Sequence, residues 1–253
     1  MNIKELRKYW EAEEHNAQMK GWNFHHIDGR FYSDEDGLTW DLSEVIHRYN
    51  CPSNRILDID TGGGEFLLSL NHPFSLTSAT EGYPPNVALC KEELCKLSID
   101  FHEMTDYTKM PFADGQFDIV INRHGNYNAN EIFRILKPNG LFITQQVGEY
   151  NDRELVKRLL PNAKKRFTGH NLKKQSEIFR NAGFEILEQN EVYRPIKFYD
   201  TGALVWFAKV IEWEFVDFSV SKCLDNLISV EQEIIQKGFI SGRIHRFYFV
   251  AKR

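Results

Sequence analysis

The chain has 253 residues, of which 42% are hydrophobic and 26% charged, and its formal net charge is −5 at pH 7. This length suits one α/β domain with additions, and the composition is that of an ordinary globular protein. The negative charge disfavours a broad phosphate-binding surface, so nucleic acid is the less favoured class of partner.

The cysteines and the first residues predict a cytoplasmic protein. The four cysteines form no C-x-x-C pair and no zinc spacing, which is typical of a reduced compartment. The start MNIKELRKYW is charged and no apolar run reaches membrane-spanning length, so we expect neither a signal peptide nor a transmembrane helix. His25 and His26 are adjacent, with no carboxylate or cysteine cluster beside them, so we expect no metal site.

The first 50 residues predict two helices around an irregular segment. Asn2 and Glu5 are spaced as a capping box at the start of an amphipathic pattern. Residues 22–40 mix aromatic and polar side chains without a period, which indicates an ordered loop. A second helix is expected over residues 42–49, because this segment has one apolar face and ends before Pro52.

From Arg55 onward, strand and helix patterns alternate, which is the sequence form of a parallel sheet with crossover helices. Residues 200–238 are too long for a hairpin loop and have helical periodicity, so they predict a helical insertion before the last strand. The seven expected strands are residues 56–59, 76–80, 99–103, 117–121, 141–147, 184–193 and 247–250.

A glycine cluster follows the first of these strands. Residues 62–64 are all glycine, which supplies turn dihedrals that a side chain would forbid and lets a ligand approach the main chain closely. Asp58 places a carboxylate just before this turn. Glu81 ends the second strand about 20 residues further on, the spacing at which an acidic side chain meets ribose hydroxyls in nucleoside-binding α/β folds. The alternative interpretations are a plain turn for residues 62–64 and a solvated loop residue for Glu81.

Together with later motifs, this pattern resembles a known family. ILDIDTGGG, Glu81, DYTKMPFADGQFDIV and EIFRILKPNGLFIT, in this order and spacing, resemble class I S-adenosylmethionine-dependent methyltransferases of type 11. The flanks resemble an uncharacterised bacterial subgroup of such proteins. The resemblance implies a Rossmann-like, doubly wound α/β fold whose seven-stranded sheet is mostly parallel with an antiparallel last strand. The implied parts are an N-terminal helical cap segment (1–50), a cofactor-binding core (51–199), a helical lid insertion (200–238) and a final core strand (239–253).

The resemblance also implies the residues that bind S-adenosylmethionine. Gly62 and Gly64 would lie against the methionine portion, and Asp58 would orient the loop or the amino group. Glu81 would accept both ribose hydroxyls, since a carboxylate offers two acceptor oxygens. Further along the chain, Asp106 would take the adenine amino group with the Tyr107 backbone beside it, and Asn122 would also bind the cofactor. For Asp106, a helix cap or a turn is the alternative interpretation.

One position departs from the family. Asp60 stands where the family usually has the first of three spaced glycines. Aspartate tolerates unusual backbone dihedrals better than most residues, so the turn can survive. Its charge would lie near the cofactor carboxylate, where like charges destabilise binding. We therefore expect Asp60 to weaken cofactor affinity without abolishing it.

The methyl acceptor is expected at the carboxyl ends of the fourth and fifth strands, where ligands of such sheets bind. His124 follows the fourth strand and titrates in the range useful for a general base, although a histidine that only hydrogen-bonds the loop fits equally well. Candidate pocket residues, for which core packing or ordinary strand ends are the alternative, are Arg123, Tyr127, Gln145, Gln146 and Trp206.

Three functions follow from these features. The favoured one is methyl transfer to a small or medium-sized organic acceptor by direct displacement at the methyl sulfonium. An RNA base methyltransferase is the first alternative, and a non-catalytic cofactor-binding protein, supported by Asp60, is the second. The sequence does not indicate an oligomeric state. The RNA alternative depends on a basic cluster, namely Lys157, Arg158, Lys164, Lys165, Arg166, Lys173 and Lys174.

Overall fold

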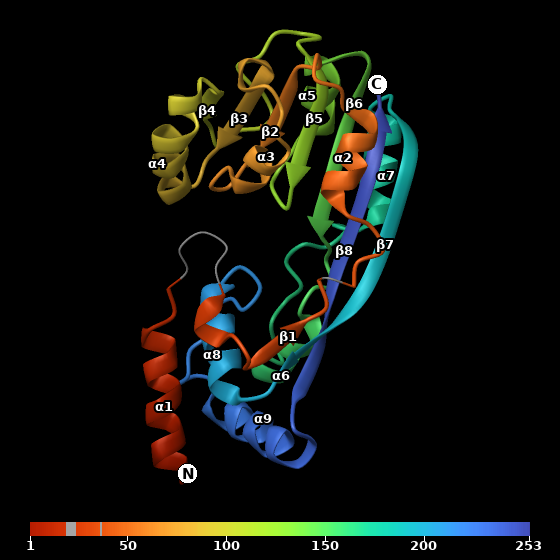
Figure 1. The fold of residues 1–253 in the computed structure, drawn as a ribbon. Coiled ribbons are helices and arrows are strands. Elements are labelled where there is room, and N and C mark those ends of the chain that lie inside the picture. The colour runs from red at the N-terminus through yellow and green to blue at the C-terminus, as the bar shows by residue number, and fades with distance from the viewer. Residues whose placement is uncertain (19–23, 36) are drawn as a thin grey trace. The chain divides into compact units, whose positions relative to one another are not determined.

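The computed structural model describes residues 1–18, 24–35 and 37–253, which form two compact units (Figure 1). Unit 1 comprises Met1–Leu38, Glu149–Thr168 and Tyr193–His245, and unit 2 comprises Thr39–Gly148, Gly169–Val192 and Arg246–Arg253. These borders differ from the expected boundaries at 50, 199 and 238. Each unit is described by itself below.

Unit 2 is built on a parallel sheet. Strands β6, β5, β2, β3 and β4 lie in this order, and each neighbouring pair is parallel. β8 pairs antiparallel with β6, from Leu141 opposite Lys252 to Val147 opposite Arg246. Strands β7 and β8 contribute residues to both units, and the complete strand order is β1-β7-β8-β6-β5-β2-β3-β4. The strands with residues in unit 2 are β2 (Ile56–Ile59), β3 (Thr77–Glu81), β4 (Asp100–Glu103), β5 (Phe117–Arg123), β6 (Leu136–Val147), β7 (Glu185–Phe198) and β8 (Ile240–Lys252).

Helices cover both faces of this sheet, because successive strand residues point to opposite sides. Ile56 and Ile119 belong to a core cluster shared with α2, α3 and α4, whereas Leu57 and Val120 belong to a cluster shared with α5 and α7. The helices of unit 2 are α2 (Leu42–Tyr49), α3 (Glu65–Ser69), α4 (Pro84–Glu93), α5 (Ala129–Ile135) and α7 (Leu172–Asn181), with 3₁₀ turns at Phe74–Leu76 and Cys95–Leu97.

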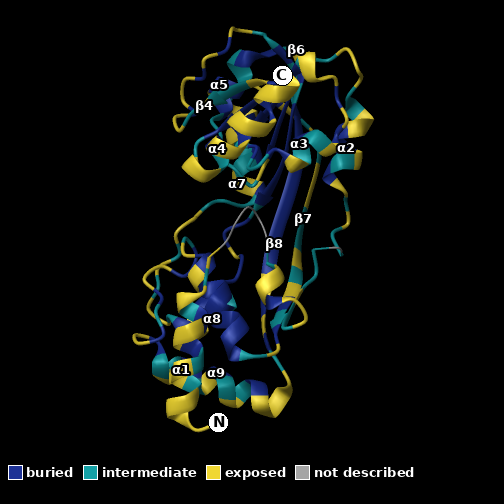
Figure 2. Ribbon diagram, turned by 60° about the vertical axis from the view of Figure 1, so that its left-hand side comes forward, coloured by how far each residue is buried: buried dark blue, intermediate teal, exposed yellow. Residues whose placement is uncertain are grey.

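Unit 1 is mainly helical and has its own hydrophobic core. Its central helix α8 is apolar on nearly all sides, and Figure 2 shows it almost wholly buried. Arg30 donates to both carboxylate oxygens of Asp200, at 2.9 and 2.8 Å, and pairs with the buried Glu13 at 2.8 Å. These contacts fasten α1 and the following segment to the start of α8. The elements are α1 (Ile3–His15), a 3₁₀ turn (His25–Ile27), β1 (Phe31–Ser33), α6 (Arg153–Leu159), α8 (Thr201–Val210) and α9 (Leu224–Lys237), with parts of β7 and β8.

The expected fold class is confirmed, but the number of strands was wrong. Within the described residues, the sheet has eight strands rather than seven, because Phe31–Ser33, in the segment expected to be a loop, pairs antiparallel with Ile196–Phe198. A strand of three residues is too short to show an alternating pattern, which is why the sequence did not reveal it. Trp22, at the start of that expected loop, lies outside the described residues. Among the residues that are described, no helix is long and apolar enough to cross a membrane.

Candidate functional site

The turn after β2 has the open backbone that a ligand needs. Gly62 and Gly64 both have positive φ, +66° and +88°, which glycine adopts without strain. A side chain built at Gly62 would meet no atom within 4 Å, whereas one at Gly64 would come within 2.8 Å of Leu94. Gly64 is therefore glycine partly for packing, but the face of the turn at Gly62 is open.

Glu81 is bound tightly to this turn. Its carboxylate is buried and accepts from the backbone N–H groups of Gly62, Gly82 and Tyr83, each at 2.8 Å. A carboxylate offers about four acceptor positions, and the Asn86 side-chain amide reaches the fourth at 3.4 Å, a long contact that a ligand hydroxyl can replace. A ligand that takes two hydrogen bonds from Glu81 has to displace one of the backbone donors.

Asp58 lies beneath the turn and is fully buried. Its Oδ2 accepts from the Thr61 hydroxyl at 2.7 Å. Burial raises the pKa of the Asp58 carboxyl to about 7, the Thr61 bond opposes this rise, and the negative charge of Asp60 adds to it. Asp58 is consequently half-protonated near neutral pH in the free protein.

Asp60 takes the glycine-like conformation that its position demands, with φ of +55°. One carboxylate oxygen accepts from the Tyr107 hydroxyl, and the other accepts from the Asn126 N–H at 2.8 Å. Burial raises the pKa of the Asp60 carboxyl, and these two hydrogen bonds oppose the rise. The charge that the sequence analysis regarded as unfavourable thus has two donors of its own.

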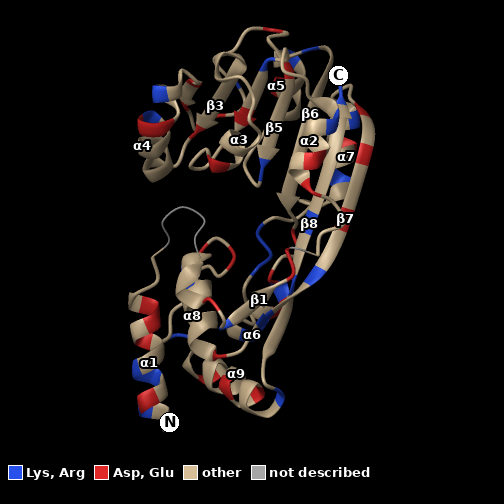
Figure 3. Ribbon diagram, viewed as in Figure 1, with Lys and Arg blue, Asp and Glu red and all other residues tan. Residues whose placement is uncertain are grey.

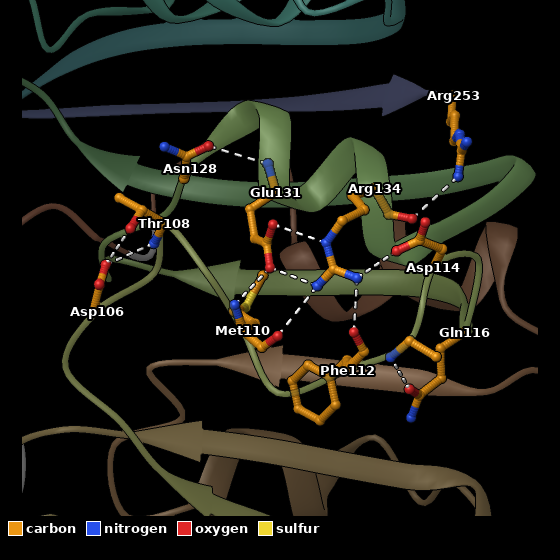
Figure 4. A network of polar contacts seen from close by, with 11 residues as sticks. Asp106, Thr108, Met110, Phe112, Asp114, Gln116, Asn128, Glu131, Arg134 and Arg253 are labelled. Atoms are coloured by element: carbon orange, nitrogen blue, oxygen red, sulfur yellow. Dashed lines mark hydrogen bonds and ion pairs between the residues drawn. The ribbon is translucent and has the colours of Figure 1, made fainter.

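Asp106 is exposed and forms a local turn. Its Oδ1 accepts from the N–H and the hydroxyl of Thr108, at 2.9 and 2.6 Å (Figure 4). The turn interpretation accounts for this oxygen, and the adenine contact stays a prediction. Tyr107 differs from the expectation, because its hydroxyl, and not only its backbone, reaches the glycine turn.

A polar network around the buried Glu131 anchors the rest of this segment to α5 (Figure 4). The guanidinium of Arg134 contacts both oxygens of Glu131, at 3.0 and 2.6 Å, and donates to the carbonyls of Phe112 and Met110. Glu131 in turn accepts from the Met110 N–H at 2.5 Å. Hydrogen bonding from Arg134 holds the pKa of Glu131 below its ordinary value. The segment that carries Tyr107 is thereby fixed at its far end.

Asn122 and Gln146 form a second buried network at the carboxyl ends of β5 and β6. Asn122 donates to the Ile59 carbonyl at 2.8 Å and accepts from the Gln146 amide at 2.5 Å. Gln146 also donates to the Thr144 hydroxyl at 2.8 Å and contacts His170 at 3.3 Å. Because they have all these partners, the Asn122 and Gln146 side chains mainly hold the ends of β2, β5 and β6 together.

His124 is held in one protonation state. The Trp40 indole donates to Gln145 Oε1 at 2.7 Å, which directs the Gln145 amide NH₂ toward His124 Nε2, 3.2 Å away. Nε2 is therefore an acceptor, and the proton of the neutral ring lies on Nδ1. Burial, helped by the positive charges of Arg246 and Arg123, holds the pKa of His124 well below its ordinary value.

The other predicted pocket residues lie in several environments. Tyr127 packs edge-on against Phe142 and Phe179, and its hydroxyl donates to Gln175 at 3.0 Å, so it is largely a packing residue of unit 2. Arg123 is exposed, with its guanidinium 5.0 Å from the Phe66 ring. Trp206 belongs to unit 1, where its buried ring stacks on His26 at 5.3 Å.

The two adjacent histidines of unit 1 have separate partners. His25 pairs with Asp28 at 2.7 Å, and His26 pairs with Glu13 at 2.6 Å. Within residues 1–18, 24–35 and 37–253, no group of three or more histidine, cysteine, aspartate or glutamate side chains could hold a metal ion.

Comparison with known proteins identifies the type of domain that contains the glycine turn. Residues 57–144, which include the glycine turn, Glu81, Asp106 and His124, match the type 11 methyltransferase domain. The chain carries an S-adenosylmethionine-dependent methyltransferase domain. No curated protein matches the sequence significantly.

Solved structures share the fold of the methyltransferase domain at low identity. The protein BH2331 from Bacillus halodurans C-125 is 17% identical over 84% of this chain and 98% of its own, with a TM-score of 0.58. An S-adenosylmethionine-dependent methyltransferase from Methanosarcina mazei is 17% identical over 85% of this chain and 99% of its own, with a TM-score of 0.51. The [4+2]-cyclase SpnF is 15% identical over 98% of this chain and 92% of its own, also with a TM-score of 0.51. At such identities the likeness shows the fold alone.

The residues of the methyltransferase domain fit S-adenosylmethionine. The open face at Gly62 leaves room beside the turn, and the Glu81 carboxylate bonded to that turn suits the hydroxyl groups of the cofactor ribose. The cofactor supplies an electrophilic methyl group, so the protein has chiefly to align the acceptor with it.

Sequence reasoning missed two members of this site. Cys90 of α4 donates from its thiol to the Gly62 carbonyl at 3.1 Å, and Gly125 lies against Asp60. Cys90 is one of a regular apolar series on its helix, so nothing in the pattern marked it. Gly125 follows His124 directly, and a glycine in a loop at a strand end was a signal that could have been used.

Proposed function

We propose that this protein transfers a methyl group from S-adenosylmethionine to a small or medium-sized organic acceptor. The observation that supports this most is the assembly of the glycine turn, Glu81 and Asp60 at one edge of the sheet, with Asp60 bonded to the loop after β5. In this proposal the turn and Glu81 hold the cofactor, and the β5–α5 loop, residues 124–128, faces the acceptor.

The roles of individual cofactor residues follow from their surroundings. Glu81 accepts one ribose hydroxyl in place of its long contact with Asn86 and the other in exchange for one of its backbone donors, and Asp58 supports the turn through Thr61. Asp106 has its second carboxylate oxygen for the adenine amino group. Asn122 acts indirectly, by fixing the end of β5 to the Ile59 carbonyl.

His124 is better suited to donate a hydrogen bond than to remove a proton. Its Nε2 lone pair is directed at the Gln145 amide, and its low pKa makes it a weak base. The Nδ1–H can instead orient the acceptor heteroatom. An acceptor that reacts as a neutral amine or an anion needs no base in the methyl-transfer step. Arg123 and Gln145 would complete the acceptor side.

The RNA alternative is weakened by the partners of the basic cluster. Arg158 pairs with Glu233 at 2.7 Å, Lys174 pairs with Glu177 at 3.6 Å, and Lys165 pairs with Glu149. The cluster is also divided between the two units, with residues 157–166 in unit 1 and residues 173–174 in unit 2. In α7, which contains residues 173–174, Glu177 separates the basic residues, and Figure 3 shows acidic and basic segments along this helix. Paired cations offer little net charge to a phosphate backbone.

The fold by itself does not settle the reaction, since a [4+2]-cyclase shares it. A lid role for residues 200–238 and a cytoplasmic location remain predictions. The test is incubation of the protein with methyl-labelled cofactor and cell extract, followed by separation of RNA, protein and small molecules. We expect label in the small-molecule fraction. Label in RNA alone would establish the first alternative, and cofactor binding without any labelled product would establish the second.

A further inference from the structure

Asp60 joins three separate segments of unit 2. It lies at the start of the glycine turn, its Oδ1 accepts from Tyr107 in the segment after β4, and its Oδ2 accepts from the Asn126 N–H in the β5–α5 loop. Its own N–H donates to the Thr80 hydroxyl of β3 at 3.3 Å. Glycine at this position could make only the last of these contacts.

The β5–α5 loop is shaped to receive Asp60. A Cβ atom built at Gly125 would lie 2.3 Å from the Asp60 Cβ and 2.7 Å from its Oδ2. Only glycine at position 125 therefore allows the loop to lie against the aspartate. The chain thus has an aspartate at position 60, where glycine is usual, and a glycine at position 125 that leaves space for this aspartate.

The carboxylate of Asp60 has acidic neighbours. Asp58 and Glu81 are near enough to influence its charge, and Tyr107 faces it with a hydroxyl. A buried carboxylate among like charges is costly unless donors satisfy it. The two donors come from the segments that Asp60 joins, so the cost is offset only while both segments are in place.

We propose that Asp60 is a positioning residue that fastens the β5–α5 loop to the cofactor turn. Occupancy of the turn by S-adenosylmethionine or its product then orders the loop that carries His124, and an ordered loop in turn favours binding. The involvement of the loop with the acceptor rests on the proposed function. The fastening itself does not.

The fastening is tested on the Asn126 amide, whose exchange with solvent reports its bond to Asp60. Asp60→Gly removes the acceptor, so exchange at Asn126 should become at least about tenfold faster in the free protein. Asp60→Asn retains one acceptor oxygen, so its exchange rate at Asn126 should lie between those of the wild type and Asp60→Gly. Asp114→Asn, at an exposed carboxylate that pairs with Arg134, is the matched control and should leave Asn126 unchanged. Equal exchange in Asp60→Gly and the wild type would overturn the proposal.

The coupling is tested by adding S-adenosylhomocysteine. In the wild type this product should slow exchange throughout residues 124–128, and in Asp60→Gly it should bind without slowing the loop. Slowing of the loop in Asp60→Gly equal to that in the wild type would refute the coupling. Failure of the wild type to bind the product would instead refute the proposed function, and the exchange of the free protein would still decide the fastening.

A pH titration tests whether Tyr107 and Asn126 both donate to the Asp60 carboxylate. The amide shift of Asn126 should follow the ionisation of Asp60, and Tyr107→Phe should move the midpoint to higher pH, because a donor to the charged form is lost. A midpoint that is the same in Tyr107→Phe and the wild type would show that Tyr107 and Asn126 do not share the Asp60 carboxylate.

Discussion

At the scale of single residues, the buried carboxyl of Asp58 makes stability depend on pH. Its pKa is about 7 in the folded protein, so it keeps its proton between pH 4 and 7, where the unfolded chain releases it. The folded state binds more protons in that range. The contribution of Asp58 to the free energy of unfolding is therefore fully present below pH 4 and is lost as the pH rises to 7. Asp58→Asn removes this contribution.

Chemical denaturation at pH 4.5 and 7.5 measures the effect. The wild type should lose stability relative to Asp58→Asn over this interval, by about 3 kcal/mol. Parallel stability curves for the two proteins would show that Asp58 ionises normally.

His124 gives a second prediction at this scale. The imidazole should be neutral at pH 6, with its proton on Nδ1, and should show no titration near 6.5. Nitrogen chemical shifts of the ring measure both properties. Gln145→Leu removes the donor to Nε2 and should relax the tautomer preference. A midpoint near 6.5 in the wild type would restore His124 as a candidate general base.

At the scale of elements, the Arg134 network should carry much of the stability of the segment after β4. Arg134 is about one third exposed, so Arg134→Met leaves the buried Glu131 carboxylate short of its main donor, and an unsatisfied buried polar group costs about 1–3 kcal/mol. Asp114→Asn removes an exposed partner of the same guanidinium and should cost less than about 1 kcal/mol. Similar losses in the two variants, measured by urea denaturation, would contradict the network.

The contact between Gly125 and Asp60 predicts a suppressor. Gly125→Ala forces a Cβ onto Asp60 and should destabilise the protein by about 1–3 kcal/mol. Adding Asp60→Gly removes the atom that is met first, so the double variant should recover part of the loss. Additive losses in thermal unfolding would mean that the two residues do not oppose each other.

The helices and strands show how much of the secondary structure can be predicted from the sequence pattern alone. The helices and parallel strands follow from apolar periodicity, and the Asn2 cap follows from residue type. β7 runs to Phe198, five residues beyond the expected end, although Pro195 lies within it. Proline is tolerated where its missing N–H is not needed, and the sequence does not show which backbone groups are paired.

At the scale of the whole molecule, the meeting of the glycine turn and Glu81 was predictable from the sequence, whereas the partners of the side chains after β5 and at the end of β6 were not. The glycines and Glu81 lie at a fixed spacing along the chain, which a linear motif records. Tyr127 and Gln146 are engaged by Gln175 and His170 from a distant part of the chain, and no local pattern shows this. Asp60 was predictable only in part, because the sequence shows an aspartate where glycine is usual but does not show its hydrogen-bond partners.

The most direct test of the account is calorimetric titration with S-adenosylhomocysteine of the wild type, Glu81→Gln and Glu103→Gln. Glu103 is the register partner of Glu81 at the end of β4, and it is exposed, so it serves as a matched control. We predict that the wild type and Glu103→Gln bind equally, and that Glu81→Gln binds at least about tenfold more weakly. Equal binding by all three proteins, or no binding by the wild type, would contradict the account.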